Sequence, residues 1–476
     1  MKRIYLYQLL VLIVLGLSAC NKQLDLAPEN DLVEEQVLED RVTTERLLVG
    51  GFYSQFLIER QALPVADFST GITSSLNGNI YYTGNVDENF GLVKDIWSGH
   101  YVVINIANVI INNLPANAKF DVSIQKQLIA EAKFLRAYSY FKLATLYGDR
   151  WFEGASAANN PCVPLRLAGF FRSDSQQIIP RSTNKQVLDQ VVKDLEEAIP
   201  DLPVSYPEAA AGVQDVKLRS RAVKSVGRAF LSRVYLYLNN YTGSISNADL
   251  VLGDTNYELA ASPSVVFPNN GTVTTGPSNI AFNREVVYGY PVSWNMYTVS
   301  STAHTYQHPF DASFLSTYNA NDMRGTTMVR PVSSGSPAVI TQRTNKYTSP
   351  NLYDNEMVIR LAEVMLNKAE ALARRDGVNQ VSIDLLNRIY QRAFVAGQKP
   401  TPYTMASFAT KELLVSRILQ ERQWELAVEG HDRYDKMRAG LPVNPVLPIN
   451  KYAFPVPITE INITGGVITQ NPGYLK

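Results

Sequence analysis

Apolar and polar residues alternate with a helical period over most of the chain. Between about residues 121 and 147, Ala130, Phe134 and Ala137 recur at spacings of three or four, which places their side chains on one helix face. A second apolar row, beginning at Leu128, lies beside the first. Because the apolar arc is so wide, we expect this helix to be covered on more than one side.

The same spacing predicts a series of helices separated by short breaks. They cover about residues 32–57, 95–114, 121–147, 185–199, 221–238, 356–375, 381–393 and 409–429. Asp121 is expected to cap one of these helices, and Thr183 and Gln186 have the spacing of a capping box. Helix pairs of similar length that recur along a chain are typical of stacked repeats. The pattern therefore predicts an all-α-dominated fold of tetratricopeptide-like helix pairs.

Two segments interrupt the helical pattern. Residues 64–89 contain several glycines and an Asn-Gly pair, and they are predicted to form a loop. Between residues 241 and 353, Gly, Ser, Thr, Asn and Pro dominate and the helical period is lost. Long irregular segments in a compact domain are usually functional or disordered, and the aromatic residues within this one favour order. We expect a loop-rich, partly irregular insert that packs on the helices and presents a surface.

Composition excludes some classes of protein. Hydrophobic residues make up 46% of the 476 residues and charged residues 18%, which is typical of a globular chain. Lys plus Arg and Asp plus Glu are equal at 44 each, so the formal net charge is zero. No dense basic block occurs, and we expect no nucleic-acid partner. The 26 Tyr suit half-wet recognition surfaces as well as helix seams.

The first twenty residues have the pattern of a secretory signal. Lys2 and Arg3 precede an apolar run from Leu9 to Leu17, which is too short to span a bilayer. Small residues then lead into Cys20, as in the lipobox of bacterial lipoproteins. We expect a lipoprotein signal peptide over residues 1–19, acylation of Cys20 and an extended tether over residues 20–31. The alternative is an ordinary signal peptide with Cys20 there by chance.

Few residues suggest metal or redox chemistry. Acylation of Cys20 would leave Cys162 without a disulfide partner, since the chain has only 2 Cys. The 4 His stand at positions that match no zinc pattern. We therefore expect no metal site and no cofactor.

The segment from Glu421 to Asp435 is dense in titratable residues. Glu421, Glu425 and Glu429 are one helical turn apart, which would suit paired acid–base carboxylates. Yet Arg417, Arg422, Arg433 and Arg438 stand nearby, and a carboxylate that faces Arg keeps a depressed pKa. No nucleophile motif or Gly-rich phosphate loop occurs. We interpret the segment as a structural ion-pair network and expect no catalytic residue.

Several separated motifs resemble those of the SusD/RagB family of nutrient-uptake lipoproteins. The first is Leu24-Asp-x-x-Pro28 after Cys20, and the second runs from Glu131 to Asp149. The third leads from Asn345-Lys-Tyr347 into residues 358–371. The fourth covers residues 421–435 and is completed by Gln470-Asn-Pro-Gly-Tyr474. Trp151-Phe152 departs from the family pattern at one local turn.

The resemblance implies a fold, a location and partners. It implies tetratricopeptide-like helix pairs with an irregular remainder, on the outer face of the outer membrane. Such proteins sit as a lid over a SusC-like TonB-dependent β-barrel transporter and help to deliver oligosaccharides or, in some members, peptides. The implied organisation is a single SusD-like domain over residues 32–476, with helical repeats over about 32–240 and 354–440 and a ligand-facing segment over about 241–353.

The expected mechanism is non-covalent capture on loops held by a rigid scaffold. Flat C–H faces of sugar rings would stack on aromatic side chains, and sugar hydroxyls would bond to amides and carboxylates. The candidate ligand-binding residues in the two loop segments are Asp67, Asn77, Asn79, Tyr81, Tyr82, Trp294, Asn295, Tyr297 and Tyr306.

Three alternatives remain open. The same architecture could capture a peptide or another nutrient. A surface glycoside hydrolase would need two carboxylates facing each other at about 5–10 Å across a cleft. The chain could also have a purely structural role in the cell envelope.

Overall fold

Helices dominate the computed structural model, which describes residues 34–74, 80–170, 178–206, 219–267, 282–290, 309–334, 339–347 and 355–475. The α-helices are α2 (Glu34–Glu39), α3 (Arg41–Thr70), α4 (Ile80–Thr83), α5 (Gly91–Asn117), α6 (Val122–Tyr147), α7 (Asn184–Ala198), α9 (Lys224–Tyr237), α10 (Tyr241–Leu252), α11 (Ala312–Leu315), α12 (Leu361–Asp376), α13 (Gln380–Arg392), α14 (Lys411–Glu425), α15 (Asp432–Arg438) and α16 (Ile458–Ile463). Short 3-10 turns include η1 (Trp151–Ala157) and η3 (Pro263–Val266). The predicted all-α-dominated fold is confirmed.

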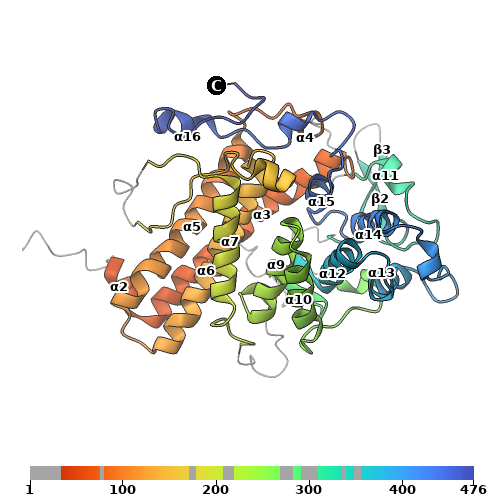
Figure 1. Cartoon of the computed structure of the whole chain (residues 1–476), viewed down its shortest axis with the longest axis horizontal. Coiled ribbons are helices and arrows are strands. Elements are labelled where there is room, and N and C mark those ends of the chain that lie inside the picture. The colour runs from red at the N-terminus through yellow and green to blue at the C-terminus, as the bar shows by residue number, and fades with distance from the viewer. Residues whose placement is uncertain are drawn as a thin grey trace, which may run out of the picture.

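The long helices pack side by side in chain order (Figure 1). α5 lies between α3 and α6, and α6 packs against α7. The row continues from α7 through α9 and α10 to α12, which contacts both α13 and α14. This succession of neighbouring partners agrees with the predicted tetratricopeptide-like helix pairing.

α6 lies at the centre of the main hydrophobic core. Asp121 caps its N-terminus by accepting a hydrogen bond from the backbone N–H of Ser123. Every residue from Phe134 to Tyr147 is buried, as the double apolar row predicts. The Phe134 ring meets Phe52 of α3 and Phe230 of α9, so neighbours cover α6 on more than one side.

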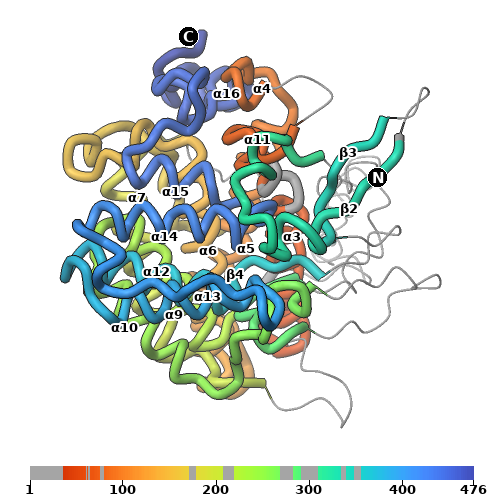
Figure 2. Tube along the Cα trace, turned by 90° about the vertical axis from the view of Figure 1, so that its right-hand side faces the viewer, coloured from red at the N-terminus to blue at the C-terminus, as the bar shows by residue number. Residues whose placement is uncertain are grey.

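In the ranges that the structure describes, two pairs of antiparallel strands accompany the helices. β1 (Val286–Tyr290) pairs with β4 (Glu356–Arg360), and every residue in both strands is buried. β2 (Val329–Ser334) pairs with β3 (Val339–Thr344), and Figure 2 shows this pair at the edge of the molecule. Because β4 runs directly into α12, the β1–β4 pair ties the irregular segment to the helical row.

The predicted loop over residues 64–89 begins too early, because residues 64–70 are helical. α3 continues unbroken from Arg41 to Thr70, through both the Gly50-Gly51 pair and the start of the expected 64–89 loop. A Cβ on Gly51 would lie 3.0 Å from Leu135 Cδ1 and 3.3 Å from Ile106 Cγ2. Gly51 therefore lets α3 approach α5 and α6 closely. In the sequence alone, a glycine needed for such packing cannot be distinguished from one that ends a helix.

Two boundaries of the irregular segment also need correction. Residues 241–252 form α10 rather than loop, with the Asn240 side chain accepting from Gly243 N and with Ile245, Ala248 and Val251 buried. Its Ser, Gly and Asn content hid this short apolar face. Residues 356–360 form β4 rather than the first turn of a helix. Because both faces of β4 are buried, its sequence shows no alternation that would distinguish it from a helix.

The described ranges contain neither a membrane span nor a metal cluster. None of the helices there has the length and apolar character needed to cross a bilayer. No group of three or more His, Cys, Asp or Glu side chains in these ranges is arranged to hold a metal ion.

Candidate functional site

Most of the predicted ligand-binding residues cannot be placed. Trp294, Asn295, Tyr297 and Tyr306, together with Asn77 and Asn79, lie outside the described residues, as does the predicted acylation site Cys20. Their roles stay predictions.

Asp67 lies in α3 and not in a loop, because that helix runs to Thr70. Its side chain is only 3% exposed. Burial, with Asp432 nearby, raises the pKa of Asp67 well above its usual range. The predicted loop position of Asp67 is therefore wrong, and its carboxyl faces the protein interior.

Tyr81 and Tyr82 lie in the short helix α4 and are half-buried. The Tyr81 ring stacks on Phe68 at 5.9 Å and on Phe454 at 6.2 Å between centroids, and its pKa is raised by burial. The Tyr82 ring lies beside Gly71. Tyr81 therefore packs among aromatic side chains of the fold. Of the two roles that the sequence allows for a Tyr, recognition surface or packing between helices, it has the packing role.

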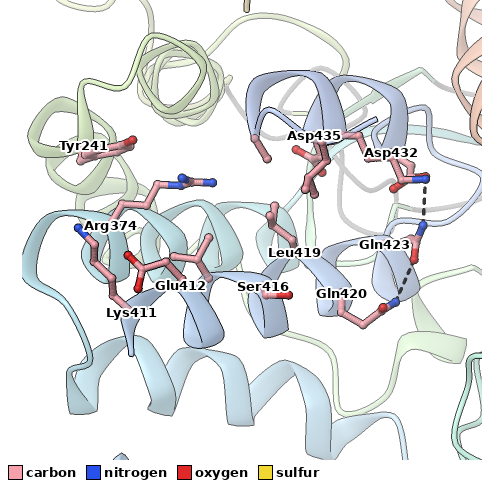
Figure 3. Close-up of a pocket in the computed structure, with 14 residues that line it drawn as sticks. Tyr241, Arg374, Lys411, Glu412, Ser416, Leu419, Gln420, Gln423, Asp432 and Asp435 are labelled. Carbon is pink, nitrogen blue, oxygen red and sulfur yellow. Dashed lines mark hydrogen bonds and ion pairs between the residues drawn. The ribbon is translucent and has the colours of Figure 1, made fainter. Parts of the chain in front are cut away.

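An open groove of about 750 Å³ lies between α10, α12, α14 and α15 (Figure 3). Tyr241 comes from α10 and Arg374 from α12, whereas Asp432, Asp435, Lys436 and Ala439 come from α15 and the residue after it. The volume is in the range of small-molecule sites, about 300–1,000 Å³. Asp67, Tyr81 and Tyr82 do not line it, so the groove is separate from the predicted site residues that the structure describes.

α14 forms the floor and one wall of the groove. Thr410 caps the helix by accepting from Leu413 N. One face of α14 is buried in the protein through Leu414, Ile418 and Glu421. The other face runs along the groove. Its residues that line the groove, at helical spacing, are Glu412, Ser416, Leu419, Gln420 and Gln423. The groove is thus lined by the more exposed face of α14.

One end of the groove gathers cationic side chains around Tyr241 (Figure 3). Arg374 donates from Nε to Glu370 Oε1 at 2.7 Å, and its terminal nitrogens make no hydrogen bond to any described residue. Lys411 likewise has no ion-pair partner in the described ranges. The pKa of Glu412 is lowered by hydrogen bonds from its own backbone N–H and from Thr410.

The other end of the groove is a connected polar wall. Gln420 Nε2 donates to Gln423 Oε1 at 2.9 Å, and Gln423 Nε2 donates to Asp432 Oδ2 at 3.1 Å. Lys436 pairs with the same Asp432 oxygen at 3.2 Å. These carboxylate and amide oxygens can accept hydrogen bonds from ligand hydroxyls, while Leu419 and Ala439 supply apolar surface.

The dense titratable segment forms a buried ion-pair network, as predicted. Arg417 Nη2 lies 2.6 Å from Glu421, and Arg360 lies 3.0 Å from Glu425 and 2.7 Å from Glu429. Burial alone would raise the pKa of Glu425, but Arg392 and Arg360 lower it below its usual range. Carboxylates held ionised in this way are poor proton donors.

Two members of the segment behave differently from the rest. Arg433 donates to the backbone carbonyl of Tyr452 at 2.6 Å and pairs with no carboxylate among the described residues. Burial lowers the pKa of His431 to about 4, although Glu363 opposes the shift. His431 is therefore neutral near pH 7, and Arg433 binds the chain near residue 452 rather than a carboxylate.

Comparison with known proteins finds relatives over most of the chain. A family model described as "SusD family" matches residues 278–444, and one described as "Starch-binding associating with outer membrane" matches residues 24–236. The chain belongs to the SusD/RagB family. SusD-like protein P38 of Formosa agariphila is 25% identical over 506 residues, covering 93% of this chain and 92% of that protein.

Solved SusD structures share the fold over nearly the full length. A SusD superfamily protein from Bacteroides thetaiotaomicron has a TM-score of 0.73 at 21% identity, covering 91% of this chain and 99% of the other. A laminarin-binding SusD-like protein has a TM-score of 0.67 at 20% identity, covering 92% and 100%. These likenesses confirm the predicted SusD-like fold.

Sequence reasoning missed the groove of this SusD-family chain. Its walls come from positions as far apart as Tyr241 and Lys411, and α10 was expected to be loop. One signal was present: the predicted helix carries a polar stripe, which consists of Glu412, Ser416, Gln420 and Gln423. Such a stripe is also what any solvated helix face would show.

Proposed function

We propose that this chain is a non-catalytic glycan-binding lipoprotein that passes its ligand to a SusC-like TonB-dependent transporter. The observation that carries the proposal is the match of residues 24–236 to the family model described as starch-binding and associating with the outer membrane. The laminarin-binding SusD-like neighbour supports a saccharide as the ligand class.

The anchor in this proposal is Cys20, acylated after removal of residues 1–19. Each buried CH₂ contributes about 0.8 kcal/mol of membrane affinity, so several acyl chains hold a protein stably. A protein anchored on the outer face can meet polysaccharides that are too large to cross the outer membrane. The transporter then imports what the binding protein has captured.

Capture in this proposal uses loops on a rigid support. The packed row from α3 to α14 is the support, and the ligand-facing segment includes Trp294, Tyr297 and Tyr306. Tyr82, which is half-buried in α4, is a candidate for contact with the ligand among the residues that the structure describes. Aromatic faces would hold sugar rings, and Asn side chains would bond to their hydroxyls.

The carboxylates of the Glu421–Asp435 segment support binding rather than hydrolysis. Glu421, Glu425 and Glu429 are buried and paired with Arg or Lys. A hydrolase needs one carboxyl group that can donate a proton at working pH, which requires a raised pKa in a cleft. In the groove, Asp435 would have its pKa raised by burial, but Arg422 and Arg438 lower it below the usual range.

Calorimetry on the mature, unacylated protein tests the proposal. The panel contains laminarin, starch, other soluble polysaccharides and a mixture of short peptides. We expect saturable binding of at least one polysaccharide and none of the peptides. Binding of peptides alone would replace the ligand class, and binding of nothing in the panel would contradict the proposal.

A further inference from the structure

The groove between α10, α12, α14 and α15 has the charge distribution of a selective site. Arg374 and Lys411 lie at one end, with Glu412 as the only carboxylate beside them among the lining residues. Asp432 at the other end is already paired with Lys436. The Tyr241 end therefore presents two cations to an incoming ligand against one lining carboxylate, and the Glu370 carboxylate that pairs with Arg374 is shared with Arg438.

We propose that this groove binds an acidic saccharide, with Arg374 and Lys411 holding the carboxylate of a uronic-acid ring. The inference rests on the proposed saccharide capture and adds to it a second site, on the helical row, with a stated preference for charge.

Arg374 is suited to a carboxylate by geometry as well as by charge. Its side chain is 23% exposed, and the bond from Nε to Glu370 fixes the guanidinium in place. The two terminal nitrogens remain free to donate on the side away from Nε, and a guanidinium can donate two parallel hydrogen bonds to one carboxylate. Figure 3 shows Arg374 and Lys411 at the same end of the groove.

Glu412 weakens this positive end less than a free carboxylate would. Its charge is taken up at the N-terminus of α14, where its own backbone N–H and Thr410 bond to it. The helix N-terminus carries partial positive charge that stabilises an anion in the first turn. The two cations therefore outweigh it for a ligand that approaches from the groove.

The rest of the groove matches a chain of sugar rings. The Ser416 hydroxyl and the Gln420 amide can exchange hydrogen bonds with ring hydroxyls, and Asp432 can accept them. Leu419 and Ala439 offer apolar surface to C–H faces, and the Tyr241 ring stands beside the cationic end. A polyhydroxylated ligand with an anionic group can use all of these contacts at once.

Calorimetry with a matched pair of probes tests the inference. The probes are trigalacturonate and its carboxyl-reduced trimer, which differ only in the carboxylates. We expect wild-type protein to bind the acidic trimer about tenfold more tightly or better, because charged hydrogen bonds contribute that much. The preference should shrink as salt is added, since exposed charges are screened.

Three variants locate the site. Arg374→Gln with Lys411→Gln should weaken binding of trigalacturonate by roughly tenfold to a hundredfold. Glu370 keeps Arg438 as a partner in this variant, which protects the fold. The matched control is Arg375→Gln with Lys399→Gln, which removes the same charge outside the groove and should bind as wild type. Ser416→Trp, at an exposed position, should block the groove for the acidic trimer.

These measurements can overturn the inference in several ways, and they separate its failure from failure of the proposed function. Equal binding of the two trimers, or full binding by both Arg374→Gln/Lys411→Gln and Ser416→Trp, would overturn the inference. So would a tripeptide that binds in place of the trimer and is lost in the same variants, because the groove would then be a peptide site. If laminarin or starch binds while trigalacturonate does not, this inference fails and the proposed function stands; if no saccharide binds, the proposed function fails.

Discussion

Arg360 pairs with three buried carboxylates. It contacts Glu285 at 2.5 Å, Glu425 at 3.0 Å and Glu429 at 2.7 Å, and its side chain is 1% exposed. Taking these charges out of water is costly, and only their mutual pairing offsets the cost. The arrangement ties β4, which carries Arg360, to β1 and α14.

Arg360→Met is expected to lower the free energy of unfolding by about 3–5 kcal/mol, because it leaves buried carboxylates without their partner. Chemical denaturation followed by circular dichroism measures this. Arg375→Gln is the control, since the Arg375–Asp376 pair is exposed and its loss should cost less than about 0.5 kcal/mol. Equal losses in the two variants would show that the network is not stabilising.

His431 predicts a pH dependence of stability. Its pKa falls from 6.5 to about 4 in the folded protein, because burial disfavours the charged ring. The unfolded chain therefore binds the proton more readily, so stability is full above about pH 6.5 and decreases as the pH falls towards 4. The contribution is roughly 3 kcal/mol. In denaturation at a series of pH values, His431→Gln should show a shallower slope over this window; an unchanged slope would contradict the assignment.

At the residue scale, the sequence predicts ion pairs between residues that are close along the chain but not pairs between distant residues. Arg417 and Glu421 are one helical turn apart, so their pairing follows from the sequence alone. Glu285 and Arg324 are far from the Glu421–Asp435 segment along the chain, and only the fold brings them to it. Likewise Glu131 pairs with Arg221 rather than with the nearby Arg136, which binds Asp194.

At the scale of elements, the two adjacent glycines of α3 have different surroundings. A Cβ added to Gly50 would meet no heavy atom within 4 Å, whereas one added to Gly51 would face Leu135 and Ile106. A side chain at Gly50 is therefore tolerated, whereas packing requires a glycine at position 51.

Gly51→Val should destabilise the protein by about 1–3 kcal/mol more than Gly50→Val does. Both changes alter helix propensity equally, so the difference reports the contact of α3 with α5 and α6. Thermal and denaturant unfolding of the two variants measure it. Equal stabilities would mean that the close approach at Gly51 is unimportant.

Regular helices with side-chain caps could be predicted from the sequence. The Thr183–Gln186 capping box begins α7 as expected, and the wide apolar arc of α6 matches its burial. α10 and β4 could not, since a small polar helix resembles loop and a strand buried on both faces lacks alternation. Their identity depends on the neighbours that cover them.

At the scale of the whole molecule, the signal and anchor motif makes a prediction about location. Cys20→Ser removes the acceptor for the acyl chains and with it most of the membrane affinity. The variant should move from the outer-membrane fraction to the soluble periplasmic fraction, measured by fractionation and immunoblotting. A protein that still sediments with the membrane would contradict anchoring through Cys20.

The fold class and the SusD-like architecture followed from motifs spread along the chain, but the candidate site did not. Helical spacing and family-like motifs report on local structure and on ancestry. The groove forms because the fold brings Tyr241, Arg374 and Lys411 close together. No local sequence pattern predicts that they lie near one another. Residues chosen by loop composition alone, such as Asp67 and Tyr81, turned out to pack within the fold.

The central claim is that the protein holds a saccharide without altering it. The most direct measurement follows laminarin, or whichever polysaccharide binds in calorimetry, through a prolonged incubation with excess protein. Chromatography of the released ligand then reports its chain length. The account predicts a saturable complex and chains of unchanged length, and shortened chains or new reducing ends formed in proportion to protein would contradict it.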